Sequence, residues 1–567
     1  MITRNIYFLI GFLLTVSLLW PLGAAPFFTH HDDVQFIRLH QMNKCFDDLQ
    51  LPCRWVPDLG GEYGYPLFNY YAPLPYYYGE IFYKLTGSLL LSVKIMFATS
   101  FIGAYVFMYL LAQKFWGKMG GSLAGIFYSY APYHAVDMYV RGAMGELWGL
   151  LFFPAILWSF FRIVEKANLL NSMVFGLLVA FLMLSHNLSA MIFIPLVLVL
   201  LLIFYIKNRS FNLLKYSCFG FFLAFLISAF YFLPVTFEKD LVHVETTISG
   251  YFSYTEHFKG LRKLFLDRSW GWGASVREVP GGEKDGLSLQ IGIVHVLFWI
   301  LSLITLVTIW KKDKRLEILI IFSSASILFS VFMIHPRSQF IWDLIEPLKY
   351  LQFPWRFLLL IIFFISLVSP AVLLITKEKY KRAIWISSLV LVVAANFLYF
   401  RPEKLLNVDE KDLLTGQAWD KQIKRSIFDY LPKSAKEPPA ELATERYKIL
   451  TGETTITNFK EKTNEISFKA DTKTHTILRL SQYYFPNWRI FDNGGEVKID
   501  YDNTLGLMTI ILGVGEHNVQ AKLFDTSIRT LGNTLTGFGI LLYVILFLFI
   551  NKKTKRWMSY YVRALRR

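Results

Sequence analysis

Apolar stretches long enough to cross a lipid bilayer recur along the whole chain. Runs of about 18 to 25 apolar residues match the length that a helix needs to cross a hydrocarbon core of roughly 30 Å. Glycine, proline and polar residues interrupt two of them, so broken or re-entrant helices are an alternative there. The predicted spans, about twelve in all, are 5–24, 88–113, 118–133, 146–161, 170–184, 188–206, 213–236, 289–310, 316–334, 355–376, 383–400 and 531–550, with the interruptions in 118–133 and 146–161.

Composition agrees with this pattern. Apolar residues make up 54% of the 567 residues and charged residues only 18%, whereas ordinary soluble chains carry roughly a quarter charged residues. The mean hydropathy is +0.41. The chain is therefore expected to be a polytopic membrane protein with the bilayer as a partner.

The positive charges alternate from one inter-span turn to the next. If the N-terminus is cytoplasmic, the inside turns and the C-terminal tail are rich in lysine and arginine, and the outside turns carry few. The net charge of +16 is then explained by orientation, and no nucleic-acid partner is expected. The pattern predicts a multi-pass membrane protein with both termini in the cytoplasm. The inside turns hold Lys114, Lys118, Arg162, Lys166, Lys207, Arg209, Lys215, Lys311, Lys312, Lys314, Arg315, Lys377, Lys379, Lys381 and Arg382.

Polar segments on the outside face set the domain organisation. Residues 25–87, 134–145 and 237–288 are outer loops of a transmembrane domain at 1–400. Residues 401–530 are a polar insertion whose second half alternates as strands do, with turn signals between the strands. This pattern predicts a small extracytoplasmic β-sandwich, preceded by a linker at 401–440 with some helix. The last span and basic tail occupy 531–567.

The first outer loop has a sequence pattern that predicts two interfacial helices. Phe36, Leu39, Phe46 and Leu49 fall near one face at helical spacing, which predicts an amphipathic interfacial helix. A second interfacial helix is expected after the aromatic segment 64–79, because tyrosine suits the depth of lipid headgroups. The span before the loop ends in small residues, so a cleaved signal peptide is an alternative, although its length favours retention.

Cysteine usage leaves one question open. Cys45 and Cys53 both lie in the first outer loop, where an oxidising compartment permits a disulfide. Whether they are bridged stays open from the sequence. Cys218 lies in an apolar span, where packing is its expected role, and no metal-type cysteine spacing occurs.

The acidic pair after the first span is the strongest chemical signal. It belongs to the run His30-His31-Asp32-Asp33, and carboxylates so close to a bilayer are costly unless solvated, paired or used. Capping of the next helix by Asp32, with Gln35 completing a capping box, would explain one aspartate. The alternatives for the pair are a general base on an acceptor hydroxyl or oxygen ligands for a divalent cation such as Mg²⁺ or Mn²⁺.

A second polar cluster follows the third span. Asp137 and Arg141 stand four residues apart, as in a helical salt bridge, and Glu146 follows. The alternative is that Arg141 binds a phosphate, for which its planar guanidinium is suited. Other polar groups are expected on the same outer face as candidate substrate-binding residues. They are His31, His186, Arg268, His335, Arg337, Arg356 and, from the aromatic segment, Tyr71.

Several motifs resemble a family of bacterial membrane proteins. They are His-Asp-Asp at 31–33, Pro-Cys-Arg-Trp-Val-Pro-Asp at 52–58, Gly-Tyr-Pro-Leu-Phe-Asn-Tyr-Tyr-Ala-Pro-Leu-Pro-Tyr-Tyr at 64–77, Tyr-Val-Arg-Gly-Ala-Met-Gly-Glu at 139–146, Ser-His-Asn at 185–187 and Gln-Phe-Pro-Trp-Arg-Phe at 352–357. Together they resemble the proteins called 6-pyruvoyl-tetrahydropterin synthase-related. Tyr-Phe-Pro-Asn-Trp-Arg-Ile at 484–490 is similar to the related YfhO-like proteins. Nothing in the chain resembles the zinc-binding soluble synthase.

The architecture resembles the GT-C superfamily of membrane glycosyltransferases. The resemblance implies a helical membrane fold with two interfacial helices in the first outer loop and an acidic residue after the first span, a role that falls to Asp33 or Asp32. It also implies transfer of a sugar from a polyprenyl-phosphate carrier to an extracytoplasmic glycan, lipid or protein. Superfamily members differ in metal use, so a metal stays open. Arg141 and Arg356 are candidates for binding the carrier phosphate, because both are positively charged and both are expected on the outer side of the membrane. The alternative is a non-enzymatic transporter or assembly factor for lipid-linked glycans.

Overall fold

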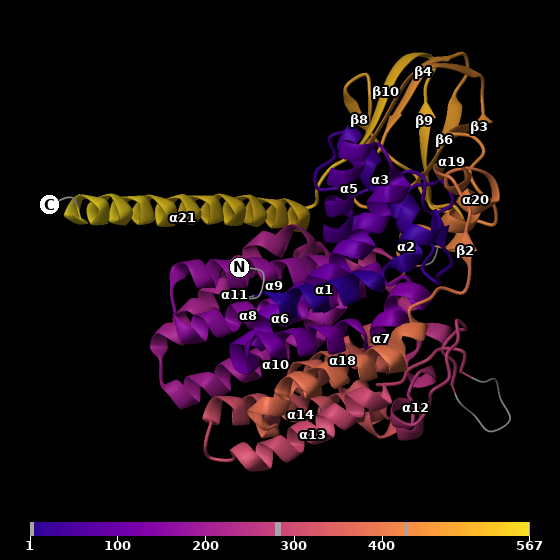
Figure 1. Cartoon of the computed structure of the whole chain (residues 1–567). Helices are drawn as coiled ribbons and strands as arrows, with labels where there is room; N and C mark the ends of the chain where they lie inside the picture. Colours follow the sequence, from indigo (N-terminus) through magenta and orange to yellow (C-terminus); the bar gives the residue numbers. More distant parts are fainter. Residues whose placement is uncertain (1–4, 278–284, 426–428, 566–567) are drawn as a thin grey trace.

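The computed structural model describes residues 5–277, 285–425 and 429–565. A body of long helices carries a β-rich domain at one end, and the last helix, α21 (Ser527–Leu565), extends away from the body (Figure 1). The coarse fold prediction, a mostly helical membrane protein with a β-rich part before the last helix, is confirmed.

Eight helical segments of the described chain are long and apolar enough to cross a membrane. They are α6 (Leu89–Ser129), α8 (Met144–Glu165), α10 (Asn187–Asn208), α11 (Phe211–Phe237), α14 (Lys314–Ile334), Pro354–Ile375, which contains α16 (Leu358–Val368) and α17 (Val372–Ile375), Glu378–Tyr399, which contains α18 (Lys381–Asn396), and Ser527–Ile550 of α21. Shorter apolar helices are α1 (Ile6–Ser17), α9 (Leu169–Ser185) and α13 (Ile293–Ile309).

Helix α6 spans two of the predicted segments. Gly117 divides it with φ 69° and ψ −177°, a conformation that glycine adopts at little cost. Each predicted span therefore falls on an apolar helix, while the number that cross the bilayer stays a prediction. Cys218 is exposed on α11, so the expectation that it packs inside the protein was wrong.

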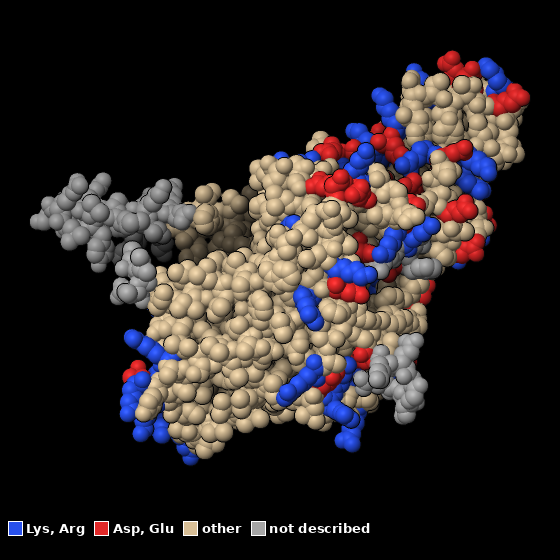
Figure 2. Space-filling model, turned by 45° about the vertical axis from the view of Figure 1, so that its right-hand side comes forward, with Lys and Arg blue, Asp and Glu red and all other residues tan. Residues whose placement is uncertain are grey.

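Charged side chains gather at the two ends of the helical body. Figure 2 shows basic residues predominating at one end and mixed charges at the other, with a broad, mostly uncharged band between them. At the basic end, Glu165 of α8 pairs with Lys114 at 2.5 Å and with Arg315 at 2.8 Å. Three turns that the charge pattern placed on one side of the membrane therefore meet in space.

The first outer loop folds as a compact layer between the helical body and the β-rich domain. Its elements are α2 (Trp20–Ala24), β1 (Phe27–Phe28), α3 (Gln35–Asp47), α4 (Leu67–Tyr70) and α5 (Leu74–Thr86). On α3, Phe36 and Leu39 are buried as predicted. Leu49 is 84% exposed, so its place on the apolar face was wrong, because α3 ends at Asp47 and Leu49 takes a φ of 58°.

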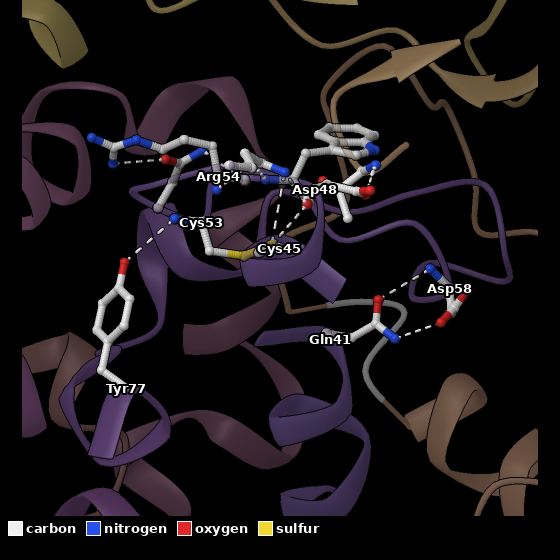
Figure 3. The surroundings of a disulfide bond; sticks show 11 residues. Gln41, Cys45, Asp48, Cys53, Arg54, Asp58 and Tyr77 are labelled. Carbon is white, nitrogen blue, oxygen red and sulfur yellow. Dashed lines mark hydrogen bonds between the residues drawn. A yellow bond between two sulfur atoms is a disulfide. The ribbon is translucent and has the colours of Figure 1, made fainter. Parts of the chain in front are cut away.

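Cys45 and Cys53 form a disulfide in this layer, with their Cα atoms 5.5 Å apart. Figure 3 shows the bridge beside α3, where the Cys53 N–H donates to the Tyr77 hydroxyl at 3.3 Å. Trp55 follows the bridge and packs against Phe485 and Trp488 of the β-rich domain. The bridge thus braces the contact between the first loop and that domain.

Short helices form the remaining outer segments. Between α6 and α8 lie α7 (Pro132–Ala135) and a π-helical turn, Val136–Arg141. The loop after α11 holds the 3₁₀ turns Lys239–Leu241, Val244–Ile248, Gly250–Phe252 and Tyr254–Glu256, then α12 (Leu261–Phe265). After α14 come Pro336–Ser338, α15 (Gln339–Leu344), Glu346–Leu351 and Pro354–Phe357.

The segment before the β-rich domain returns to the first loop. Strand β2 (Leu405–Leu406) pairs antiparallel with β1, and α19 (Glu410–Leu413) and α20 (Gly416–Arg425) follow. The strands of the domain are β3 (Tyr447–Thr451), β4 (Thr454–Lys462), β5 (Glu465–Thr472), β6 (Thr476–Tyr483), β7 (Trp488–Asp492), β8 (Gly495–Val497), β9 (Leu507–Leu512) and β10 (Gly515–Leu523).

These strands make two antiparallel sheets, ordered β4-β5-β10-β7-β8 and β3-β6-β9. Both contribute to one core, with Phe468, Ile490 and Val519 from the first and Leu480 and Ile510 from the second. The strands β3 to β5 were not predicted, because β3 and β4 are mostly exposed.

Candidate functional site

A cavity of about 1160 Å³ lies where the first loop, the α7–α8 turn, helices α9 to α11 and the outer loops meet. Seven of the candidate residues line it. They are His31, Asp32, Tyr71, Arg141, Glu146, His186 and Arg356. The structure therefore brings together groups that are hundreds of residues apart in the chain.

The two aspartates after the first span face different surroundings. Asp32 is exposed and lines the cavity, and its carboxylate has no hydrogen bond or ion pair among the described residues. Asp33 lies outside the cavity lining and pairs with Lys421 of α20 at 2.9 Å. Of the two predicted catalytic residues, Asp32 is the one placed to meet a ligand in the cavity.

The capping explanation for Asp32 was wrong. Helix α3 begins at Gln35 with Val34 as its N-cap, and no side chain caps it. Gln35 serves another contact, since its amide donates to the Gly142 carbonyl at 2.9 Å and accepts from the Tyr76 hydroxyl at 2.6 Å. Capping therefore accounts for neither aspartate.

Backbone bonds hold the Asp32 segment against the π-helical turn. The N–H groups of His31 and Asp32 donate to the carbonyls of Val140 and Arg141 at 2.9 and 2.8 Å. Gly142 follows with φ 64°, and a Cβ there would lie 2.4 Å from the His30 ring. A glycine is required at this crossing, because any other residue would have a strained backbone here and its side chain would clash with the His30 ring.

Four charged residues form a buried group, here named the Glu146 cluster: Arg141, Glu146 and Arg356, which line the cavity, and Asp137 beside them. Arg141 donates to Asp137 at 2.7 Å and to both Glu146 oxygens at 2.6 and 2.7 Å. Arg356 donates to Glu146 at 2.8 Å and to the Leu351 carbonyl at 2.7 Å. The salt-bridge interpretation of Asp137 and Arg141 is therefore the one found, and both arginines already hold carboxylates.

Arg38 of α3 is a cavity arginine that sequence reasoning missed. Its guanidinium lies 3.9 Å from the centre of the Tyr71 ring, and only 6% of the residue is exposed. Its Nε has no hydrogen-bond partner, and no carboxylate of the described chain forms an ion pair with it. Nothing in the sequence sets Arg38 apart from a surface arginine, because its burial depends on how α3 packs in the fold.

Lys239 is a second cation of the cavity without a carboxylate among the described residues. Its ammonium group lies 3.4 Å from the Tyr350 hydroxyl. An ordinary lysine at the end of a span gives no sequence signal, because such residues usually serve as interface anchors.

Asp429 and Tyr430 also line the cavity, although they come from the linker before the β-rich domain. Neither was predicted, because the linker showed no periodic pattern. Burial raises the pKa of Asp429 to about 6, with Asp32 raising it further and Arg38 opposing the shift. Asp429 therefore lies within electrostatic range of both Asp32 and Arg38.

The rest of the cavity wall is apolar. It is formed by α9, α10 and α11, with Met183, Leu188, Met191, Ile194, Pro195, Phe232 and Val235. The outer surface of α10 continues with Leu198, Val199 and Leu202, each about half exposed, in a helix long and apolar enough to cross a membrane. The cavity therefore joins a polar end to an apolar wall on a membrane helix.

Three candidates lie away from the cavity. Arg268 and Arg337 are exposed on separate outer loops, and His335 caps a 3₁₀ turn by accepting from the Arg337 N–H at 3.2 Å. The indoles beside Arg268 are used in packing, since Trp270 stacks on Tyr399 with centroids 4.7 Å apart. The expected convergence of these three residues with the others is not found, because none of the three lines the cavity.

The described residues contain no group of three or more histidine, cysteine, aspartate or glutamate side chains placed to hold a metal ion. Asp32 and Asp429 are two acidic groups of the cavity, which is fewer oxygen ligands than Mg²⁺ or Mn²⁺ sites made by protein alone require. These side chains alone thus do not complete a cation site, and the divalent cation stays a prediction.

Residues 68–276 match the family model described as 6-pyruvoyl-tetrahydropterin synthase related domain, membrane protein. The family resemblance predicted from the sequence is thereby confirmed. This segment reaches from the first outer loop to the loop after α11 and includes the Glu146 cluster except Arg356. No curated protein matches the chain.

Six chains of solved structures resemble this one. One is ArnT from Cupriavidus metallidurans bound to undecaprenyl phosphate, with 12% identity and a TM-score of 0.43 over 69% of this chain and 63% of that chain. Another is the oligosaccharyltransferase of Archaeoglobus fulgidus, solved with zinc and sulfate, with 14% identity and a TM-score of 0.43 over 76% of this chain and 58% of that chain. The chain spans less than two thirds of the length of either protein.

Proposed function

We propose that this chain is a membrane glycosyltransferase that moves a sugar from a polyprenyl-phosphate carrier to an acceptor outside the cytoplasm. One observation carries the proposal: the cavity joins a carboxylate and a guanidinium without ion-pair partners to an apolar wall on α10. A lipid-linked sugar has the same three parts, namely hydroxyl groups, a phosphate and an isoprenoid chain.

The donor phosphate binds Arg38, with Lys239 as a second cation. Arg141 and Arg356, the candidates from the sequence, are less suited because a phosphate would have to displace Glu146 from both. An anion that meets a buried, unpaired guanidinium gains charge-assisted hydrogen bonds at no such cost. The isoprenoid chain lies along Leu188, Met191 and Ile194 and leaves the cavity toward lipid.

Asp32 acts as the general base. Its carboxylate takes the proton of an acceptor hydroxyl while the hydroxyl oxygen forms a bond to the anomeric carbon. The bond from that carbon to the phosphate oxygen breaks, and its electron pair stays on the phosphate, which leaves as polyprenyl phosphate. Arg38 and Lys239 stabilise the charge that develops on the leaving phosphate. No step is routed through a metal.

The site belongs on the outer face of a bacterial inner membrane, with both termini in the cytoplasm. The cavity lies at the end of the body that carries the first loop, and the basic end around Glu165 lies at the other end of α8. The β-rich domain stands over the first loop through Trp55, where it would meet a glycan, lipid or protein acceptor.

Mass spectrometry of cell-surface glycans in a deletion strain tests the proposal. The expected result is the loss of one sugar, restored by the wild-type chain. Accumulation of an intact lipid-linked intermediate would instead support a transporter or assembly factor. Unchanged glycans and lipid intermediates would contradict both.

A further inference from the structure

The segment that enters the β-rich domain contributes Asp429 and Tyr430 to the cavity. We propose that these two residues form the subsite for the transferred sugar and that Asp429 binds its hydroxyl groups directly. This inference rests on the proposed function, because it concerns the donor that occupies the same cavity.

The first support is the state of the Asp429 carboxylate. It lines the cavity, and within the described part of the chain it has no hydrogen bond and no ion pair. Glu146, in the same wall, is held by two arginines. A partly buried carboxylate without a partner loses hydration and gains nothing in return, so a ligand that donates hydrogen bonds to it is favoured.

The second support is the way the chain is fixed at this point. The Tyr430 N–H donates to the Tyr65 hydroxyl, and the Tyr430 ring stacks on Tyr70 with centroids 5.5 Å apart. The following residues pair with the loop after α11, where the His243 N–H donates to the Leu431 carbonyl at 2.8 Å. The subsite is therefore pre-formed, which lowers the cost of binding.

The chemistry favours a sugar over other ligands. A phosphate in direct contact with Asp429 would be repelled by its charge, and the described residues hold no group of three or more histidine, cysteine, aspartate or glutamate side chains for a metal ion. Hydroxyl groups donate to a carboxylate, and the C–H face of a sugar ring packs on an aromatic ring such as Tyr430 or Tyr71. Because Asp429 and Asp32 line the same cavity, a sugar bound at Asp429 shares that cavity with the proposed base.

Binding to purified full-length protein in detergent tests the subsite. The probes are undecaprenyl phosphates that carry glucose, mannose, arabinose or N-acetylglucosamine, and undecaprenyl methyl phosphate as a reference with the same charge and no sugar. We expect the wild-type chain to bind at least one sugar probe about tenfold more tightly than the reference, as hydrogen bonds to a charged group allow. Asp429→Asn should abolish that preference and leave the affinity for the reference unchanged.

Asp420→Asn is the matched control, since Asp420 belongs to the same linker and lies outside the cavity lining. It should keep the wild-type preference. Unaltered preference in Asp429→Asn, or equal binding of all sugar probes and the reference by the wild type, would overturn the sugar subsite. If the wild type binds neither the reference nor a sugar probe, the proposed function fails as well, so the two failures are distinguishable.

Discussion

The cavity contains two groups of charges that are built differently. In the Glu146 cluster every charged side chain holds an opposite charge, with donor–acceptor distances of 2.6 to 2.8 Å. In the same cavity, Asp32, Arg38 and Asp429 have no ion pair among the residues described, although they lie within electrostatic range of one another.

This difference separates structural charges from binding charges. Buried ions that satisfy each other stabilise a fold only as a set, and the loss of one member leaves the others uncompensated. Charges that stay unpaired in a cavity lower the stability of the fold, and other interactions must offset this cost. Such charges are frequent at sites that bind a ligand. In the proposed function, the Glu146 cluster therefore shapes the wall and the unpaired residues contact the ligand.

Glu146→Gln should have the largest effect of the substitutions considered, and it should act on stability. It leaves Arg141 and Arg356 buried without their shared carboxylate, and removal of one partner from a buried ion pair costs about 3 to 5 kcal/mol. Folded protein should be lost on extraction, measured by fluorescence-detected size exclusion after heating.

Glu165→Gln is the control on the same helix. Glu165 is 41% exposed at the basic end, and surface pairs contribute about 0 to 1 kcal/mol. It should behave nearly as the wild type. Equal behaviour of both variants would show that the Glu146 cluster is not a structural unit.

Asp32→Asn should abolish transfer while the protein stays folded. Loss of a general base slows a reaction by about 100- to 10,000-fold. Asp33→Asn should reduce transfer less than about threefold, since Asp33 lies outside the cavity lining and its pair with Lys421 is partly exposed. Both are measured by complementation of the deletion strain, with glycans analysed by mass spectrometry. If Asp33→Asn had the larger effect, Asp33 would be the general base. If both variants kept full transfer activity, neither aspartate would be the base.

Arg38→Gln should weaken the binding of undecaprenyl methyl phosphate by about tenfold or more, because a charge-assisted contact to the phosphate is lost. Arg268→Gln is the control, an exposed arginine outside the cavity. Affinity is measured by native mass spectrometry of the purified chain. Unchanged binding in Arg38→Gln would instead favour Arg141 and Arg356 as the residues that bind the phosphate.

The spans and the aspartate pair could be predicted because they follow local rules. Long apolar runs must form helices in lipid. An acidic pair beside a bilayer is costly, so it indicates a functional site. The choice between Asp32 and Asp33 could not be predicted, since it depends on Lys421, nearly four hundred residues away.

The partners of the arginines could not be predicted either. Arg141 and Glu146 are close in sequence, yet Arg356 joins them through the fold of a loop more than two hundred residues later. Asp429 and Tyr430 lie in a linker without periodicity, and only the antiparallel contact of the linker with the loop after α11 brings them to the cavity. Arg268, His335 and Arg337 share the outer face with the site, but a shared face does not imply contact.

The smallest expected effect is a pH dependence that distinguishes Asp429 from the paired charges. Burial raises the pKa of Asp429 to about 6, with Arg38 opposing and Asp32 reinforcing the shift, whereas Asp in an unfolded chain titrates near 3.9. If only the ionised form binds, affinity for a sugar-linked undecaprenyl phosphate should fall by about tenfold between pH 7 and pH 5, and Asp429→Asn should remove this fall. The ligand phosphodiester keeps one charge over that range.

Stability should move in the opposite direction over the same pH range. A carboxyl whose pKa is raised by folding binds its proton more tightly in the folded state, so its contribution to stability grows as the pH falls through about 6 and is lost as the pH rises. Weaker binding at pH 5 without a lower melting temperature would therefore identify titration of the site. A fall in both would indicate acid unfolding, and a binding constant that is flat from pH 7 to pH 5 would remove Asp429 from the sugar subsite.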